Sequence, residues 1–439
     1  MKSAWSKKTI GELCANGGGK VQTGPFGSQL HQSDYSDNED GTPVVMPADI
    51  PSGKIGVSRI ARVSEAHVQR LARHQLEKGD IIYGRRGDIG RQALVREENV
   101  GWLCGTGCLR IRLGKSDVDS EYLHRYLTMP EIVGWIEGQA IGATMPNLNT
   151  DILNRVPIYF PPLPTQRKIA AILTAYDDLI ETNKQRIALL EKMAEELYRE
   201  WFVRMRFPGH ENTRFVKGVP EGWTVKRISD VYQTASGGTP SRKSPEYFSG
   251  DIQWLKTGEL KDLFTPDSEE KITQSALESS AARLFPASTV IMAMYCAMPD
   301  ISIATYDCAT NQACCAFLPK FDWLHYGYNY FVLRDAQKQL VMFAHGAAQQ
   351  NLSQEIIRKF QVLLPNKTLI EEFGRNVEPL LLMIRELSDS IRILTKTRDL
   401  LLPRLISGKL SVENLDIQFP PGMQEETPEP ESAYAELHL

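Results

Sequence analysis

Residues 161–201 read PPLPTQRKIAAILTAYDDLIETNKQRIALLEKMAEELYREW, and this stretch decides the fold of the 439-residue chain. After a proline-rich junction, apolar or aromatic side chains recur at steps that alternate between four and three residues. The series consists of Ile169, Leu173, Tyr176, Ile180, Asn183, Ile187, Leu190, Ala194, Leu197 and Trp201. This heptad pattern predicts one long helix with a continuous seam, which Pro208 and Gly209 should end.

The same pattern recurs 204 residues later. The matching positions are Phe373, Val377, Leu380, Ile384, Leu387, Ile391, Leu394, Arg398 and Leu401, and Arg398 interrupts the apolar run. Thr368 and Glu371 have the spacing of a capping box at the helix start, and Pro403 is expected to kink or end the helix. Because a duplicated unit favours closed two-fold symmetry, we expect the two seams to meet in an antiparallel coiled coil. In the alternative arrangement, each helix packs separately on its own domain.

The duplication extends to the domains that precede the helices. The segment 142–149 is matched by 346–353 at the same offset of 204, whereas Trp5 and Ile10 are matched by Trp223 and Ile228 at an offset of 218. Short apolar runs bounded by Gly, Pro and Asp predict mixed, mostly β domains. The expected fold is therefore α+β, with two similar domains joined by two long antiparallel helices and pseudo-two-fold symmetry. The expected segments are 1–162 (first domain), 163–208 (central helical region), 209–365 (second domain), 366–408 (C-terminal helical region) and 409–439 (acidic, disordered tail).

The charge distribution is compatible with nucleic-acid binding. The net charge is −4, but the segment from Glu413 onward has seven acidic and no basic residues, so the rest of the chain carries +3. Between Lys54 and Arg112 there are 12 basic residues against six acidic ones. A positive face is thus available for phosphates. The longest charge-free, apolar-leaning stretch, 284–299, is shorter than the roughly 20 residues of a membrane-spanning helix, so we expect a cytoplasmic protein without membrane contact.

The residue pattern offers little catalytic chemistry. The run Gly17–Lys20 is followed by Val21 and lacks the spacing of a phosphate-binding loop, and no Cys or His pair has the spacing of a zinc site. Asp251, Glu259 and Lys261 superficially resemble the carboxylates and lysine of metal-dependent nucleases. This similarity is weak, so we expect no catalytic residue, no metal and no cofactor on this chain.

Loops rich in Gly, Ser, Thr, Gln and Arg occur in both domains and suit contact with DNA. Arginine pairs with guanine and glutamine with adenine, while glycine lets the backbone approach phosphate closely. The predicted contact residues in the first domain are Gln22, Thr23, Gly24, Phe26, Ser28, Arg85 and Arg86. In the second domain they are Ser236, Gly237, Thr239, Ser241, Arg242, Lys243, Lys256 and Thr257.

Several of these segments together resemble the specificity subunit of type I restriction-modification systems. The resemblance runs from Trp5 to about Gly408 and is carried by PPLPTQRKIA (161–170), GGTPS (237–241), WLKTGEL (254–260), NLN (147–149) and NLS (351–353). One departure is the second junction, Leu364–Thr368, which lacks the glutamine that this family often has there.

The resemblance implies two target-recognition domains that each read one half of a split, double-stranded DNA target. The helical regions would set the spacing between the halves and dock two methyltransferase subunits, which flip and methylate adenine. Restriction subunits with the motor and nuclease would join the complex. S-adenosylmethionine, ATP and Mg²⁺ would then belong to these partners. Two alternatives stay open, namely a coiled-coil assembly or inhibitory protein of a restriction complex and a metal-dependent nuclease.

Overall fold

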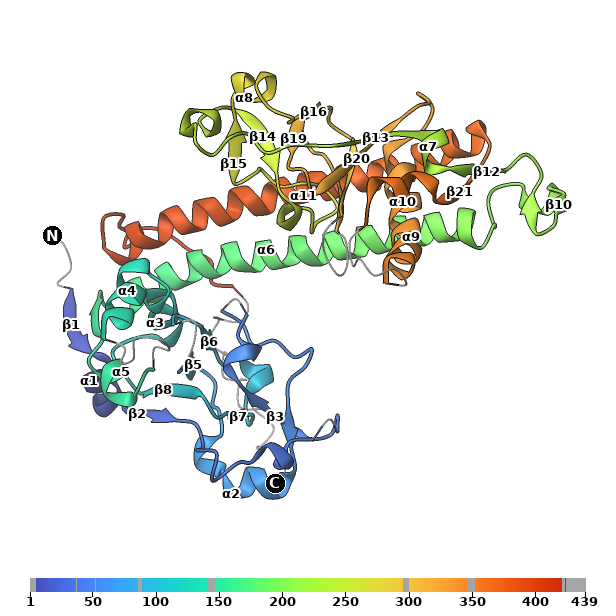
Figure 1. Ribbon diagram of the computed structural model, residues 1–439. Coiled ribbons are helices and arrows are strands. Elements are labelled where there is room, and N and C mark those ends of the chain that lie inside the picture. The colour runs from blue at the N-terminus through green and yellow to red at the C-terminus, as the bar shows by residue number, and fades with distance from the viewer. Residues whose placement is uncertain are drawn as a thin grey trace, which may run out of the picture. The chain divides into compact units, whose positions relative to one another are not determined.

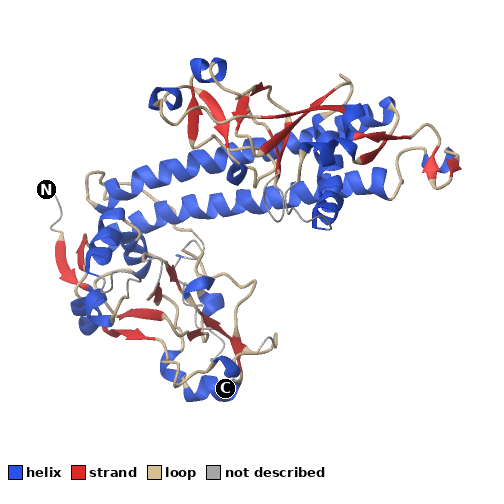
Figure 2. Cartoon of the chain, viewed as in Figure 1, coloured by secondary structure: helices blue, strands red, loops and turns tan. Residues whose placement is uncertain are grey.

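The structure is a computed structural model that describes residues 5–36, 38–51, 53–85, 89–139, 147–294, 300–345, 352–420 and 423. The chain divides into two compact units: unit 1 is residues 1–181 with 392–439, and unit 2 is residues 182–391. Two long helices, α6 (Leu163–Tyr198) and α11 (Lys367–Ile406), each contribute to both units. Each unit also contains one head of mixed strands and short helices (Figures 1 and 2). The prediction of two mixed domains and two long helices is confirmed.

Head 1 is the part of unit 1 that precedes α6. Its larger sheet is antiparallel with the order β2-β8-β5-β6, its smaller sheet has the order β4-β3-β7, and β1 pairs with β9. Its strands are β1 (Ser6–Thr9), β2 (Gly18–Thr23), β3 (Thr42–Val45), β4 (Arg62–Val63), β5 (Ile81–Gly84), β6 (Gln92–Leu94), β7 (Leu103–Cys104), β8 (Cys108–Gly114) and β9 (Pro157–Phe160). Its helices are α1 (Ile10–Gly17), α2 (Glu65–Arg70), α3 (Ser120–Leu127), α4 (Pro130–Gln139) and α5 (Thr150–Asn154).

Head 2 is the part of unit 2 between α6 and α11, and it repeats this plan. The sheet β13-β20-β17-β18 corresponds to the larger sheet, β15-β14-β19-β16 to the smaller one, and the pair β12-β21 to β1-β9. Its strands are β10 (Phe215–Val216), β11 (Val219–Pro220), β12 (Thr224–Arg227), β13 (Tyr232–Ser236), β14 (Ile252–Leu255), β15 (Glu270–Ile272), β16 (Leu284–Phe285), β17 (Val290–Ala293), β18 (Ile301–Ile303), β19 (Cys308–Thr310), β20 (Cys314–Pro319) and β21 (Gln361–Leu364). Its helices are α7 (Ile228–Val231), α8 (Gln274–Glu278), α9 (Tyr326–His345) and α10 (Gln354–Lys359).

Matching hydrogen bonds show that the sequence repeat is a repeat of structure. In head 1, the amide of Ile10 donates to the carbonyl of Val156 at 3.1 Å, and in head 2 the amide of Ile228 donates to the carbonyl of Phe360 at 2.8 Å. The two donors are related by the offset of 218, and the two acceptors by the offset of 204. Both sequence offsets therefore correspond to equivalent positions in the two heads.

The long helices run antiparallel within each unit. In unit 1, Ile169 and Leu173 at the start of α6 share a core with Leu405 and Ile406 at the end of α11.

In unit 2, Asn183 Nδ2 donates to Ser390 Oγ at 3.2 Å, and the rings of Trp201 and Phe373 lie 5.8 Å apart. Residue numbers thus rise along α6 as they fall along α11. All twelve side chains of the predicted seam are buried or half-buried: Ile169, Leu173, Ile180, Asn183, Ile187, Leu190, Val377, Leu380, Ile384, Leu387, Ile391 and Leu394.

Three details at the helix ends differ from the sequence prediction. The start of α11 is capped by Asn366, whose Oδ1 accepts from the amide of Leu369 at 2.9 Å, and not by Thr368. Pro403 lies inside α11, which continues to Ile406 because tertiary packing of the last turn outweighs the effect of the proline ring. The α-helical part of α6 ends at Tyr198, and one π-helical turn follows, well before Pro208.

The chain after α11 packs on unit 1. Val412 is buried in the core of this unit, and Lys168 Nζ donates to the carbonyls of Glu413 and Leu415 at 2.8 and 2.7 Å. The first residues of the predicted tail are therefore in contact with α6, whereas 421–422 and 424–439 lie outside the described residues.

Gln166 connects the start of α6 to head 1. Its side chain is fully buried, its Oε1 accepts from the amide of Asp119 at 2.9 Å, and its Nε2 donates to the carbonyls of Asp117 and Pro161 at 2.9 and 2.7 Å. The equivalent position in unit 2 is Ile370 on α11, which is also fully buried but lies in an apolar core. Gln166 is thus a structural residue. The second junction lacks this glutamine, and an apolar contact takes its place there.

Replacing Gln166 by Ile, the residue at the equivalent position, should destabilise unit 1. The substitution leaves a buried amide and two carbonyls without partners, each of which costs about 1–3 kcal/mol. Urea unfolding of Gln166→Ile should show a free energy of unfolding lower by at least about 2 kcal/mol. The control Gln185→Ile, at an exposed position of α6, should change it by less than about 0.5 kcal/mol. Equal effects of the two substitutions would contradict this role.

Gly24 and Gly237 follow equivalent strands at places where two backbones nearly touch. A Cβ on Gly24 would lie 2.0 Å from the carbonyl oxygen of Gly105, and one on Gly237 would lie 1.9 Å from that of Thr310. Only glycine fits such a close approach without displacing the backbone.

The substitution Gly24→Ala should therefore shift the loop after β2 and lower the free energy of unfolding by about 1–3 kcal/mol through overpacking. Gly27→Ala is the matched control, because nothing lies within 4 Å of its Cβ position. Chemical denaturation of both variants provides the comparison. If Gly24→Ala is as stable as Gly27→Ala, the close approach does not constrain the loop.

Candidate nucleic-acid interface

The predicted loops of head 1 converge at one end of its sheets. We call this group loop cluster 1, and it consists of residues 24–28, 46–49, 84–85 and 105–107. The segment 105–107 is central, since the amide of Gly105 donates to Val45, the carbonyl of Gly107 accepts from the amide of Arg85, and Thr106 Oγ1 donates to Pro25. These distances are 2.9, 2.8 and 3.0 Å.

Head 2 contains an equivalent group, loop cluster 2, made of residues 237–241, 256–259, 294 and 311–313. The amide of Asn311 donates to Leu255 at 3.0 Å, and the amide of Met294 donates to Ala313 at 2.8 Å. Thr239 Oγ1 donates to Gln312 Oε1 at 2.5 Å. The two backbone connections are therefore equivalent in the two heads, and the third contact is made by different side chains between the same loops.

The Asn-Leu segments that come after α4 in head 1 and after α9 in head 2 also form matching hydrogen bonds. In head 1 the amide of Leu148 donates to the carbonyl of Arg85 at 2.9 Å, and in head 2 the amide of Leu352 donates to Met294 at 3.1 Å. The Arg85 guanidinium hydrogen-bonds Asn147 Oδ1 and the Leu148 carbonyl at 3.2 and 3.1 Å. Arg85 thus joins the Asn-Leu motif to loop cluster 1. Arg86 lies outside the described residues.

The other predicted residues of head 1 differ in how available they are. Gln22 Nε2 donates to the carbonyl of Arg73 at 3.2 Å and its Oε1 accepts from Arg110 at 3.2 Å, so this side chain has partners inside the head. Thr23 is half-buried and Gly24 is buried. Phe26 is 58% exposed and Ser28 is exposed. Among the predicted residues of loop cluster 1, these two are exposed.

Three cations next to Gln22 and Gln29 were not among the predicted residues. Lys20, Arg70 and Arg73 are exposed, and we call them the basic edge of head 1. Arg73 donates to Gln29 Oε1 at 3.3 Å and Arg70 to the Gln29 carbonyl at 3.0 Å. Arg70 also lies 3.8 Å from Asp34, whereas Arg73 has no acidic partner among the described residues. The excess of basic residues between 54 and 112 was the signal that could have located this edge.

His74 is buried beside the basic edge, next to Arg73 and Arg110. Burial, followed by the charges of Arg73 and Arg110, lowers the pKa of His74 to about 4. The imidazole therefore stays neutral near pH 7, so it hydrogen-bonds Arg73 without adding a further charge.

In head 2, two of the three predicted cations, Arg242 and Lys256, are paired with acids. Arg242 lies over the ring of Phe248 at 4.1 Å and contacts Glu270 at 2.7 Å. Lys256 Nζ lies 3.0 Å from Glu269 and 3.4 Å from Glu270. The charges of Arg242 and Lys256 are therefore partly neutralised, unlike that of Arg73 at the basic edge of head 1.

The remaining predicted residues of head 2 are divided between structure and surface. Ser236 Oγ accepts from Gln354, Gly237 is buried, and Thr257 is half-buried at the start of a 3₁₀ turn. The exposed residues are Thr239, Ser241, Arg242 and Lys243.

Glu259, one of the residues that resemble a nuclease site in sequence, has a structural role. Its two oxygens accept from the amides of Lys256 and Glu269 at 2.7 and 2.8 Å. The equivalent Asp49 in head 1 accepts from the amide of Met46 at 2.8 Å. Among the residues that the structure describes, no group of three or more His, Cys, Asp or Glu side chains could hold a metal ion. No described helix is both long and apolar enough to cross a membrane.

Comparison with known proteins finds the same family in both halves of the chain. The family model described as type I restriction modification DNA specificity domain matches residues 2–192 and 220–370. The type I restriction enzyme MjaIX specificity subunit of Methanocaldococcus jannaschii is 29% identical, over 85% of this chain and 88% of that protein. The HindI specificity subunit of Haemophilus influenzae is 24% identical, over 77% and 88%.

A solved structure shares the fold. The crystal structure of the type I restriction-modification S subunit from M. genitalium superposes with a TM-score of 0.62 at 17% identity, and the match covers 92% of this chain and 96% of that one. The duplicated heads, their paired helices and the two matches of the family model agree. The chain therefore belongs to the family of type I restriction-modification DNA specificity subunits, which recognise DNA and are not themselves catalytic.

Proposed function

We propose that this specificity subunit reads a bipartite double-stranded DNA target in the cytoplasm, with residues 1–162 and 209–365 as its two target-recognition domains. The observation that supports this proposal is the duplication of the loop cluster by equivalent hydrogen bonds. Two clusters of one geometry but different side chains suit two half-targets of different sequence. Base contacts would come from the exposed loop residues, while phosphate contacts position each head.

In head 1, the basic edge is the proposed phosphate contact. Arg73 has no acidic partner among the described residues, and it lies beside Gln22 and Gln29, with which it forms hydrogen bonds. In head 2, Arg242 and Lys256 would first have to exchange Glu270 for phosphate, so Lys243 is the more available cation.

The helices are the proposed docking surface for two methyltransferase subunits. Each unit exposes apolar side chains from both helices, and four of them occupy repeated positions: Leu179 (45% exposed) and Ile393 (58%) in unit 1, and Leu189 (63%) and Met383 (49%) in unit 2. These positions correspond pairwise at the offset of 204. Because exposed apolar side chains on a helix are typical of interaction surfaces, their repetition supports two equivalent docking sites.

Restriction subunits would join this complex and supply the motor and nuclease. S-adenosylmethionine, ATP and Mg²⁺ are assigned to the partner subunits in this proposal. The chain itself would contribute recognition and geometry.

Removal of one proposed phosphate contact should weaken DNA binding without changing the target. For Arg73→Ala, the plot of log K against log salt concentration should become less steep by about 0.9, the value for one lost phosphate contact. Lys115→Ala is the control, since Lys115 is exposed at the far end of β8 from loop cluster 1. Fluorescence anisotropy at several salt concentrations measures both slopes. An unchanged slope for Arg73→Ala would remove the basic edge from the interface.

The function itself is tested by expressing the chain with its methyltransferase partner and mapping methylated adenines across a genome. The expected result is a split motif with a fixed, unread spacer. Exchange of residues 1–162 for those of another specificity subunit should change one half of the motif only. A complex that assembles but methylates nothing would instead favour an assembly or inhibitory protein.

A further inference from the structure

Unit 1 contains a cluster of three charged side chains where head 1 meets both long helices. Asp177 on α6 lies between Arg125 on α3 and Arg398 on α11, and the contact of Arg398 Nη1 with Asp177 Oδ1 measures 2.5 Å. The side chains are 12% (Arg125), 17% (Asp177) and 29% (Arg398) exposed. We call these three residues the charged triad. Arg398, which interrupts the apolar seam in sequence, is thereby paired within the seam.

The equivalent positions in unit 2 are apolar. The offset of 204 relates Asp177 to Leu381 and Ala194 to Arg398. The helices α3 and α9 align through Tyr122 and Tyr328, whose hydroxyls donate to the equivalent carbonyls of Tyr159 and Leu363 at 2.9 and 3.2 Å. This alignment relates Arg125 to Phe331.

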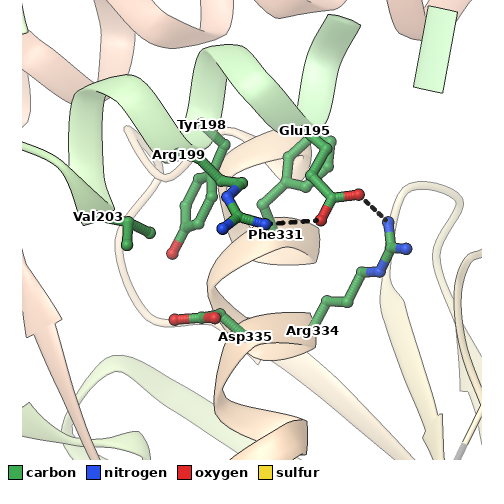
Figure 3. Close-up of a pocket in the computed structure, with 7 residues that line it drawn as sticks. All are labelled: Glu195, Tyr198, Arg199, Val203, Phe331, Arg334 and Asp335. Carbon is green, nitrogen blue, oxygen red and sulfur yellow. Dashed lines mark ion pairs between the residues drawn. The ribbon is translucent and has the colours of Figure 1, made fainter. Parts of the chain in front are cut away.

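Ala194, Phe331 and Leu381, which we call the apolar triad, are buried to at least 98% and belong to one core. Figure 3 shows Phe331 against Tyr198, and their rings are stacked 5.5 Å apart. Beside them Glu195 pairs with Arg334 at 3.5 Å at the rim of this site (Figure 3).

We propose that the exchange of a charged triad for an apolar triad determines which helix halves pair, and that it prevents two copies of this chain from pairing like with like. Because the halves are duplicated, an α6 helix has the apolar pattern to pack on a second α6, and α11 on a second α11. At the observed register, Asp177 would then face Ala194 of the other copy, and Arg398 would face Leu381. Asp177 would keep Arg125 and Arg398 would keep its neighbour Asp399, but both arrangements replace the Asp177–Arg398 ion pair by a contact with an apolar side chain at a half-buried site, which is unfavourable.

Asn183 supplies a second, independent discrimination. This side chain is 3% exposed and donates to Ser390 Oγ at 3.2 Å. In a pair of α6 helices at the same register, Asn183 would face Arg186, which carries no hydrogen-bond acceptor. Only pairing of α6 with α11 therefore satisfies the buried amide, as it does for a polar residue that sets the register of a coiled coil.

The test uses the whole chain with a protease site inserted at the exposed turn between Lys217 and Gly218, which connects β10 to β11. After cleavage of the folded wild-type protein, the two pieces should remain associated one to one. In the variant Arg125→Phe, Asp177→Leu, Arg398→Ala, each piece should also pair with a copy of itself. Native mass spectrometry distinguishes the three masses, and we expect at least a tenfold increase in like-with-like pairs.

Two further variants separate pairing from stability. Asp177→Leu alone removes the carboxylate that lies between Arg125 and Arg398, leaves Arg398 only its neighbour Asp399, and should lower the Tm. The triple variant should recover the Tm, because apolar replacement of a buried ion pair or triad is often neutral or stabilising. Arg398→Leu changes only one residue. It should allow self-pairing of the C-terminal piece but not of the N-terminal piece. The exposed pair Lys367–Glu371, changed to alanines, is the matched control.

One-to-one association that persists in both the triple variant and Arg398→Leu would overturn the proposal, as would redistribution of the wild-type pieces. None of these measurements involves DNA, so the result is independent of the proposed recognition function.

Discussion

The packing of each long helix against the second half of the other is the contact on which the rest of the structure depends. The core of unit 1 includes Leu405 and Ile406 from the end of α11, and the core of unit 2 includes Tyr198 and Trp201 from the end of α6. Burial of one large apolar side chain contributes about 1.5–3 kcal/mol, and folded domains are stable by only about 5–15 kcal/mol. Each head therefore depends on a helical segment that follows the other head in sequence. Neither copy of the repeat completes its core without the other copy.

The repeated backbone contacts fix the positions of the loops but do not fix which side chains the loops carry. Backbone contacts at Gly24 and Gly237 bring the loops of each head to the same place, and the segments 105–107 and 311–313 connect them by amide and carbonyl groups. Backbone hydrogen bonds do not depend on the side chain, so exposed positions can differ freely between the heads. Phe26 in one cluster and Thr239 in the other illustrate this. A frame of this kind suits two recognition surfaces of different specificity.

The architecture was predictable because it depends on periodicity and repetition, which are properties of the sequence itself. The heptads and the two offsets could be located in advance, and short apolar runs indicated mixed, mostly β heads. The cap at Asn366 was missed because Thr368 also had a capping pattern, and only the backbone geometry distinguishes them. The basic edge was missed for a different reason. Arg70 and Arg73 reach Gln29 across about 40 residues of sequence, and no local pattern shows which of many cations stay without an acidic partner.

The two halves share their backbone plan but differ in buried electrostatics. Head 1 places Arg110 and Arg112 against Asp80 on a sheet face where head 2 has Ala316 and Leu318. The charged triad shows the same divergence at the helices. Buried charges are costly unless they are paired, so such differences persist only where each charge has a fixed partner. If the two halves of the chain were identical, either half could take the place of the other, and the second half would add nothing. Divergence of the buried charges makes the halves complementary to each other, and two different recognition surfaces are then always present in one chain in a fixed combination.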